Sequence, residues 1–179
     1  LAWKLRKGLY TSVAGARPSG TTALLEDIVV PVPQLAPTCA SLQDLFATYS
    51  YRDSVIFGHA KDGNIHFMLT DRFEGDAALG RFTSFTEEMV DLVLGAGGNL
   101  KAEHGTGRVM APYVRRQYGE ELYQVMRELK RLCDPTGMLN PGVIIEDDPR
   151  AHLRNIKLAE PIEAEADEQA VEAERVLEI

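Results

Sequence analysis

The sequence predicts one α+β domain over residues 1–157, a ferredoxin-like antiparallel sheet with helices on one face. Stretches of branched apolar residues alternate along the chain with segments whose apolar residues recur at helical spacing. Their order, strand, helix, strand, strand, helix, strand, is that of the split β-α-β unit. With 179 residues and 45% hydrophobic content, the chain is also long enough to bury one sizeable core.

The first half of the chain predicts a helix end, a loop, a strand and a second helix. Residues 1–9 have a helical pattern with Gly8 near its C-terminus, and the Gly, Pro, Ser and Thr residues of 15–22 indicate a loop. Residues 23–32 are rich in branched apolar side chains and end among prolines, which is typical of a strand. Residues 37–49 place Leu and Phe at helical spacing behind an early proline, which predicts a helix.

A β-hairpin is predicted next. Residues 54–60 and 64–70 have the composition of strands, and the Asp-Gly pair at 62–63 is a strong signal for a two-residue turn. Such a turn would place His59 directly opposite His66 on the same face of the hairpin. Their Cβ atoms would then be about 5 Å apart, close enough for both imidazoles to bind one metal ion.

The second half of the chain predicts more helix than strand. Residues 77–94 repeat Leu, Phe, Met and Val near the helical period and end at a run of glycines. Residues 99–103 are short enough to form a fourth strand. Residues 111–118 and 120–132 have helical patterns, and Asp-Pro at 134–135 ends the second of them.

Charge, cysteine spacing and hydropathy argue against several classes of protein. The net charge of -8 argues against nonspecific binding to nucleic acid, and much of it lies in residues 158–179, which we expect to be an acidic helical tail or linker. Cys39 and Cys133 are far apart without a CxxC spacing, so neither a disulfide scaffold nor a zinc ribbon is indicated. No transmembrane segment or signal peptide is visible, so we expect a cytoplasmic protein, with peripheral attachment to a membrane through an electron acceptor left open.

Three of the four histidines fall in two segments that contain glycine. His59 and His66 lie in GHAKDGNIH, and His104 follows Glu103 in AEHGTG. If the fourth strand joins the sheet, Glu103 can reach the face that carries the two hairpin histidines. Two imidazoles and a carboxylate suit zinc, manganese or iron and leave positions open for water or substrate. A turn at Gly105 would swing His104 into this site as a general base.

Three motifs in this order resemble one known family. GHAKDGNIH is similar to the Gly-His-x-x-Asp-Gly-Asn-x-His signature of the C-terminal domain of FAD-linked oxidases, the D-lactate dehydrogenase, glycolate oxidase and D-2-hydroxyglutarate dehydrogenase group. AEHGTG resembles that family's Glu-His-Gly-x-Gly segment, and residues 134–142, DPTGMLNPG, resemble its closing Asp-Pro-x-x-x-Leu-Asn-Pro-Gly. The chain beyond Gly142 and the stretch 15–31 are similar to a subgroup that is fused to an iron-sulfur domain.

The resemblance implies roles for individual residues. The residues that match the family's divalent metal ligands are His59, His66 and Glu103. His104 matches the active-site base, and Asn140 lies in the closing motif, where a contact with the cofactor is implied. Arg6, in a Trp-x-x-Arg-Lys-Gly stretch, looks like the arginine that pairs with the substrate carboxylate, a role that suits the two parallel donors of a guanidinium.

The function that the resemblance implies is oxidation of a D-2-hydroxy acid of the D-lactate or glycolate type, with hydride transfer to flavin. FAD would be bound mainly by a flavin domain of the same parent chain, and an iron-sulfur domain downstream is a further expected partner. Nothing in the 179 residues resembles that flavin domain, so we expect the chain alone to lack redox activity. Leu25 and Met68 replace a lysine and a polar residue of the D-2-hydroxyglutarate enzymes, which argues against a dicarboxylate substrate.

Two other functions fit the same residues. A metal-dependent hydrolase would use the two histidines and Glu103 to activate water. A non-catalytic ferredoxin-like binding module would carry the histidines as structural or surface residues.

Overall fold

The structure is a computed structural model that describes residues 2–156, except for the side chains of residues 2–7 and 9. The acidic tail expected at 158–179 lies outside the described residues. Among the described helices, none combines the length and the apolar content needed to cross a membrane.

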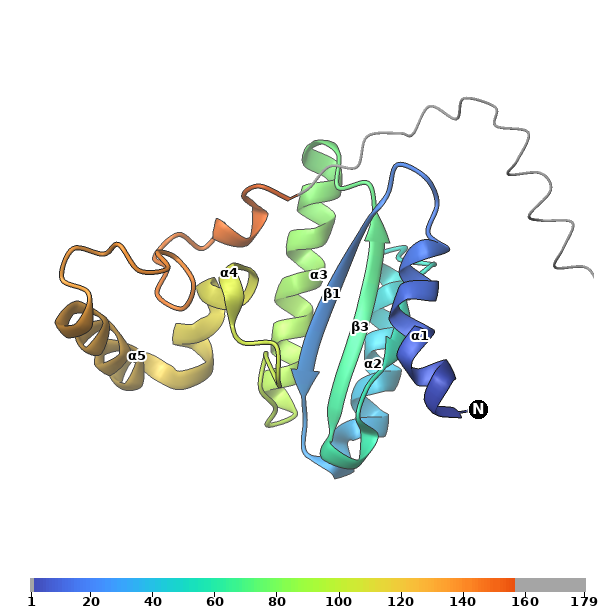
Figure 1. Cartoon of the computed structure of the whole chain (residues 1–179), viewed down its shortest axis with the longest axis horizontal. Helices are drawn as coiled ribbons and strands as arrows, with labels where there is room; N and C mark the ends of the chain where they lie inside the picture. The colour runs from blue at the N-terminus through green and yellow to red at the C-terminus, as the bar shows by residue number, and fades with distance from the viewer. Residues whose placement is uncertain (1, 157–179) are drawn as a thin grey trace, which may run out of the picture.

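Three antiparallel strands form the sheet, in the order β1-β3-β2 (Figure 1). β1 is Thr22–Val29, β2 is the short Val55–Phe57, and β3 is Asn64–Asp71. β3 lies in the middle, pairs with β1 along its whole length, and is buried over most of its residues. The α+β class predicted from the sequence is confirmed.

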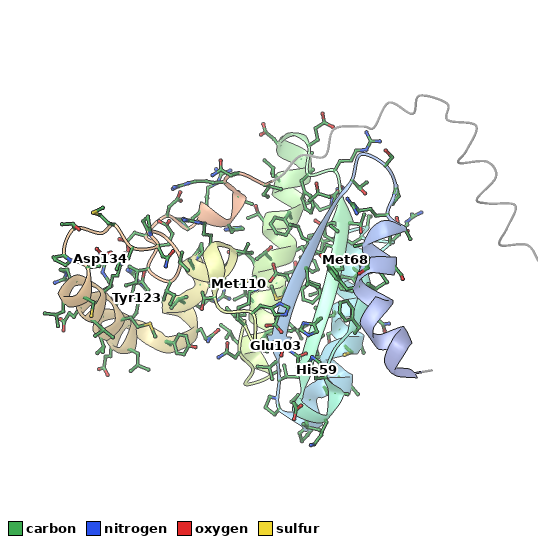
Figure 2. All side chains as sticks on the ribbon, in the orientation of Figure 1. His59, Met68, Glu103, Met110, Tyr123 and Asp134 are labelled. Atoms are coloured by element: carbon green, nitrogen blue, oxygen red, sulfur yellow. The ribbon has the colours of Figure 1, made fainter. Side chains whose placement is uncertain are left out.

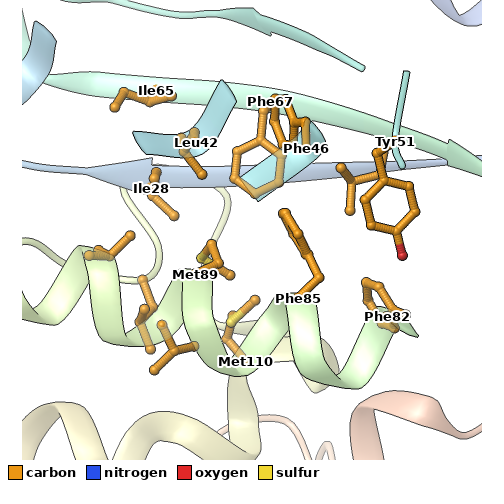
Figure 3. Close-up of a cluster of buried hydrophobic side chains, with 14 of the residues drawn as sticks. Ile28, Leu42, Phe46, Tyr51, Ile65, Phe67, Phe82, Phe85, Met89 and Met110 are labelled. Atoms are coloured by element: carbon orange, nitrogen blue, oxygen red, sulfur yellow. The ribbon is translucent and has the colours of Figure 1, made fainter. Parts of the chain in front are cut away.

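Two long helices, α2 (Leu35–Thr48) and α3 (Gly75–Gly95), lie against one face of this sheet (Figure 1). Phe85 is central to the core between them, with its ring centroid within 6.1 Å of those of Phe46, Tyr51 and Phe67 (Figure 3). Such stacked and edge-to-face aromatic pairs add to the free energy gained by burying the rings. Further buried core residues are Ile28, Leu42, Ile65, Leu69, Phe82, Met89, Val90 and Val93.

The other helices agree with the sequence in part. α1 spans Ala2–Gly15, so the prediction that this helix ends near Gly8 is wrong, because the helix accommodates that glycine in its interior. α4 (Gly107–Met110) and a short 3₁₀ turn lead into α5, Val114–Cys133. α5 changes direction at Gly119, whose φ of 80° and ψ of 165° are not helical, and it extends away from the sheet (Figure 1). The two helical stretches predicted around this glycine and the stop before Asp134 are confirmed.

Residues 99–103 do not form the expected fourth strand. They pair with β1 through a single bridge between Val29 and Asn99, with N···O distances of 2.8 and 3.0 Å. The segment therefore lies beside β1, where a fourth strand would be, but it leaves the strand path after this bridge. The physical reason is that the side chain of Asp27 accepts hydrogen bonds from the backbone N–H groups of Ala102 and the two residues after it.

The hairpin also differs from the prediction. His66 pairs with Phe57 rather than with His59, and residues 58–63 form a longer connection that contains the 3₁₀ turn Ala60–Asp62. This connection folds back on the end of β1, where the carbonyl oxygen of Gly63 accepts a hydrogen bond from Val30 N at 3.0 Å. This hydrogen bond with Val30 takes the place of the two-residue turn. It requires the backbone at Gly63 to approach the end of β1 closely, which a tight turn does not provide.

Gly63 is required at this contact for two reasons. Its φ is 71°, and a Cβ atom added to it would lie 2.0 Å from the carbonyl oxygen of Val30. We expect Gly63→Ala to lower the free energy of unfolding by several kcal/mol, of which about 1–2 kcal/mol reflects the left-handed backbone alone. Urea denaturation followed by circular dichroism measures the change.

Gly97 provides the matched control, because it has a similar φ of 73° but nothing within 4 Å of an added Cβ. Gly97→Ala should lower the free energy of unfolding only by the smaller amount that reflects the left-handed backbone. Equal losses in the two variants would contradict the steric role of Gly63.

His152 is a buried histidine away from the cluster described below. It lies in the 3₁₀ turn Ala151–Leu153, is 4% exposed, and packs against the rings of Phe82 and Tyr113. Both of its ring nitrogens are buried. Burial lowers its pKa below the ordinary 6.5, and the attraction of Glu87 opposes this only in part.

This lowered pKa predicts a loss of stability in mild acid. Because the unfolded chain binds a proton near pH 6.5 while the folded chain resists it, the free energy of unfolding should fall as the pH drops below about 6.5, by at most about 1.4 kcal/mol for each pH unit. His152→Phe keeps a ring in the same aromatic surroundings and should remove this part of the pH dependence. Thermal or urea unfolding of both proteins between pH 7.5 and 5 measures the difference, and parallel pH profiles would show that His152 does not contribute.

Candidate functional site

The face of the sheet opposite α2 and α3 carries a group of polar residues at one end of β1 and β3. Side chains alternate between the two faces of a strand, so Ile28 and Ile65 enter the core while their neighbours Asp27 and His66 point to the other side. Figure 2 shows Glu103 and His59 at this end of the sheet. The site is thus built where β1, β3 and the segment after Asn99 meet.

Glu103 joins the two histidines of the hairpin segment. Its Oε1 lies 3.1 Å from Nε2 of His59 and 3.1 Å from Nε2 of His66. The two imidazole rings are 5.4 Å apart and nearly perpendicular. The structure therefore brings together the three residues that resemble metal ligands, although His59 enters from the loop rather than from the strand position expected for it.

His104 lies beside this group. Its ring stacks on that of His66 at a centroid distance of 4.9 Å and an angle of 11°. Its Nε2 is 4.0 Å from Oε1 of Glu103, and its side chain is 43% exposed. His104 is thus next to the cluster and accessible to a small molecule.

Asp27 is the residue of this site that sequence reasoning missed. Its side chain is fully buried, and its Oδ2 accepts hydrogen bonds from the backbone N–H groups of Ala102, Glu103 and His104 at 3.1, 2.7 and 2.9 Å. Burial alone would raise its pKa, but these donors and the amide of Asn64 outweigh it and lower the pKa below the ordinary value. The available signal was the acidic pair at 26–27 inside an otherwise apolar strand.

Asn64 links the histidine loop to β1. Its Nδ2 donates to Oδ1 of Asp27 at 2.7 Å, and its Oδ1 accepts from the backbone N–H of His59 at 3.3 Å. Because both ends of the amide are used, its orientation is determined by these two partners. The Asp-Gly-Asn sequence thus places an amide between the loop and the buried carboxylate.

The acid next to Asp27 anchors the same segment from the other side of β1. Glu26 is 4% exposed, and its Oε2 lies 2.7 Å from Nζ of Lys101. Burial raises the pKa of Glu26, and the nearby lysine opposes this only in part. The ion pair holds the chain two residues before Glu103.

The protonation of His66 suits metal binding. Burial lowers its pKa, and the attraction of Asp27 opposes this effect without cancelling it. A neutral imidazole is the form that binds a metal, so no proton has to be displaced from the ring at neutral pH.

The residues present fit a divalent metal. Ligand atoms of Asp27, His66, Glu103 and His104 all lie within 4.8 Å of one another. Ligands held at 2.0–2.2 Å around one ion are themselves about 3 Å apart, which is the separation that Oε1 of Glu103 makes with both Nε2 atoms. A mixed set of imidazole and carboxylate ligands suits zinc, manganese or iron.

The two other predicted site residues are placed differently. Arg6 belongs to α1, but its side chain lies outside the described residues. Asn140 has a φ of 44° and lines a cavity of about 600 Å³ between α5 and the closing segment, together with Thr106. The residues that line this cavity do not include His59, His66, Glu103 or His104.

Asp134 holds the turn at the start of the closing segment, residues 134–142. Its carboxylate accepts hydrogen bonds from the backbone N–H groups of Met138 and Leu139 at 3.0 and 2.8 Å. A hydrogen bond from Lys130, together with these backbone donors, lowers the pKa of Asp134 to about 2. The turn that leads to Asn140 is therefore held by a charged carboxylate.

Comparison with known proteins agrees with the three motifs. The family described as FAD linked oxidases, C-terminal domain, matches residues 1–144. The chain is 31% identical over 148 residues to the glycolate oxidase subunit GlcD of Bacillus subtilis, a match that covers 83% of this chain and 31% of that protein. It is 30% identical over 154 residues to the mitochondrial D-lactate dehydrogenase [cytochrome] of Kluyveromyces lactis, covering 84% of this chain and 26% of that protein.

A third relative is the D-2-hydroxyglutarate dehydrogenase of Xanthomonas citri pv. viticola, which is 31% identical over 149 residues, with 80% of this chain and 30% of that protein covered. The chain thus spans less than a third of the length of these relatives. Since the family match extends over most of the chain, the chain belongs to the family of C-terminal domains of FAD linked oxidases.

Proposed function

We propose that this chain is the substrate- and metal-binding domain of an FAD-dependent dehydrogenase that oxidises a D-2-hydroxy acid. One observation carries the proposal: Oε1 of Glu103 lies 3.1 Å from Nε2 of both His59 and His66, in a chain whose family is that of FAD-linked oxidases. The names of its relatives, glycolate oxidase, D-lactate dehydrogenase and D-2-hydroxyglutarate dehydrogenase, support this class of substrate.

His59, His66 and Glu103 would hold the metal, which supplies a Lewis acid for the 2-hydroxyl group of the substrate. His104 would take the hydroxyl proton at Nε2, the nitrogen on the side of Glu103. Bound FAD would supply the acceptor for the hydride that leaves C2, so that the hydroxy acid becomes a 2-oxo acid. Arg6 would pair with the substrate carboxylate through two parallel hydrogen bonds.

The surroundings of His66 favour a monocarboxylate such as D-lactate or glycolate. Leu25 and Met68 pair across β1 and β3 on the same face as Asp27 and His66, one step along the sheet. On the other side, the ring of Phe57 lies 5.5 Å from that of His66. A second carboxylate placed against these apolar residues would lose hydration without gaining a partner.

A flavin domain of the same parent chain would cover α5 and the cavity beside it. Apolar residues on one stripe of α5 remain open to solvent at 54% to 81% exposure: Leu122, Val125, Leu129 and Leu132. The cavity lined by Asn140 lies next to them, which supports a role for Asn140 in contact with the flavin or its domain. An iron-sulfur domain of the parent protein would be the next electron carrier. The support for it is the sequence resemblance to the subgroup that carries such a domain.

The metal site can be tested on the 179-residue chain alone. We expect about one equivalent of Zn²⁺ or Mn²⁺ per chain in titration calorimetry, and at least a tenfold lower affinity after His59→Ala, His66→Ala or Glu103→Gln, because each removes one of three ligands. His152→Phe alters a buried histidine elsewhere and should bind metal as the unchanged chain does. Absence of metal binding, or equal affinity in the ligand variants and this control, would contradict the site.

The reaction can be tested with the flavin domain present in the parent protein. D-lactate or glycolate should reduce a dye with this protein, and His104→Asn should lower kcat by about 10²- to 10⁴-fold, because a general base is lost. The flavin absorbance and the metal content should stay unchanged in this variant.

Full turnover in His104→Asn would contradict the role of the base, and failure with a panel of 2-hydroxy acids would contradict the substrate class. Hydrolysis of an ester or phosphate by the 179-residue chain without flavin would favour a metal-dependent hydrolase instead.

A further inference from the structure

We propose that Asp27 is a positioning residue for this site, acting through two contacts of its buried carboxylate. One oxygen holds the turn that carries Glu103 and His104, and the other sets the tautomer in which His66 offers Nε2 to a metal. The inference rests on the proposed function for the metal, and on contacts within this chain for the geometry.

The first contact is an anion site made by the backbone. Three successive N–H groups, those of Ala102, Glu103 and His104, converge on Oδ2 of Asp27 within 3.1 Å. Successive N–H groups that point at one atom favour a negatively charged acceptor. The directions in which the side chains of Glu103 and His104 leave the backbone are therefore fixed by Asp27.

The second contact concerns the ring of His66. Its Nδ1 is buried and makes no hydrogen bond, and it lies 3.3 Å from Oδ1 of Asp27, while its Nε2 faces Oε1 of Glu103. An ionised carboxylate attracts an N–H group and repels a lone pair, so Asp27 favours the tautomer with the proton on Nδ1. A cation bound by Glu103 would remove the competing acceptor at Nε2, and the lone pair of Nε2 would then be free to bind the cation.

The loop histidine is connected to the same carboxylate. Asn64 donates to Oδ1 of Asp27 and accepts from the backbone N–H of His59. Thus four residues are connected to the side chain of Asp27, directly or through Asn64: His59, His66, Glu103 and His104. This side chain is fully buried and does not need to touch the substrate.

Asp27→Asn is the decisive variant because it keeps the shape of the side chain. Its amide group must present NH₂ either to three backbone N–H donors or to the side of Asn64 and His66. In the second orientation the amide would donate to Nδ1 of His66 and move the ring proton to Nε2, which blocks the metal ligand. We expect Zn²⁺ affinity to fall by about 10- to 100-fold. This is the usual loss when the group that faces the other ring nitrogen of a metal-binding histidine is changed.

Two measurements on the 179-residue chain test this. Zn²⁺ titration calorimetry gives the affinity, and two-bond ¹⁵N–¹H NMR spectra of the histidine rings show which nitrogen of His66 carries the proton. Glu26→Gln is the matched control, since it changes the neighbouring buried acid, whose hydrogen-bond partner is Lys101. This control should keep the affinity within about threefold and leave the His66 tautomer unchanged.

The proposal is supported if Asp27→Asn is folded by circular dichroism, binds Zn²⁺ at least tenfold more weakly, and has the His66 proton on Nε2. It is overturned if the affinity or the tautomer matches that of Glu26→Gln.

Glu103→Ala decides the question if Asp27→Asn does not fold or if the unchanged chain binds no metal. The side chain of Glu103 is 53% exposed, and its removal takes away the other acceptor near His66. In this metal-free variant the ring proton of His66 should lie on Nδ1, and a proton on Nε2 would overturn the role of Asp27. This result does not depend on metal binding, so it separates a failure of the inference from a failure of the proposed function.

Discussion

The buried carboxylate of Asp27 is the interaction on which the rest of the site depends. Removing an anion from water costs several kcal/mol unless donors replace the water that it loses. Here three backbone N–H groups and the amide of Asn64 do so, and the pKa of Asp27 is lowered despite its burial. Because these donors come from the segment after Asn99 and from β3, the fold that brings these segments to β1 also brings the residues of the cluster together.

The segment that carries Glu103 is held on both sides of β1. Glu26 and Asp27 are neighbours and so point to opposite faces of the strand: one pairs with Lys101, the other with the backbone that follows it. A regular fourth strand would instead direct every second N–H group of this segment to the backbone of β1. The side chain of Asp27 competes for these groups, and the strand is replaced by a turn that brings Glu103 and His104 to the histidines.

Periodicity and local turn rules predicted the α+β class, the two core helices and the break at Gly119, but not the geometry around the site. The Asp-Gly rule assumes a tight turn, whereas Gly63 is needed for a close approach to Val30 that lies 33 residues away in sequence. His59 and His66 meet all the same, because the longer loop folds back. The acidic pair at 26–27 marked the strand as unusual but did not assign Asp27 to the site, since an acid within a strand is typical of a solvent-facing position.

The domain leaves two groups of residues open to solvent. Within the cluster His59, Glu103 and His104 are 35%, 53% and 43% exposed, and α5 presents a stripe of apolar residues to solvent. Charges in contact with water interact weakly, and their interactions strengthen several-fold when water is excluded. On the proposed function, docking of a flavin domain would bring the hydride acceptor and would also exclude water from Glu103, which would strengthen the attraction between its carboxylate and a bound metal.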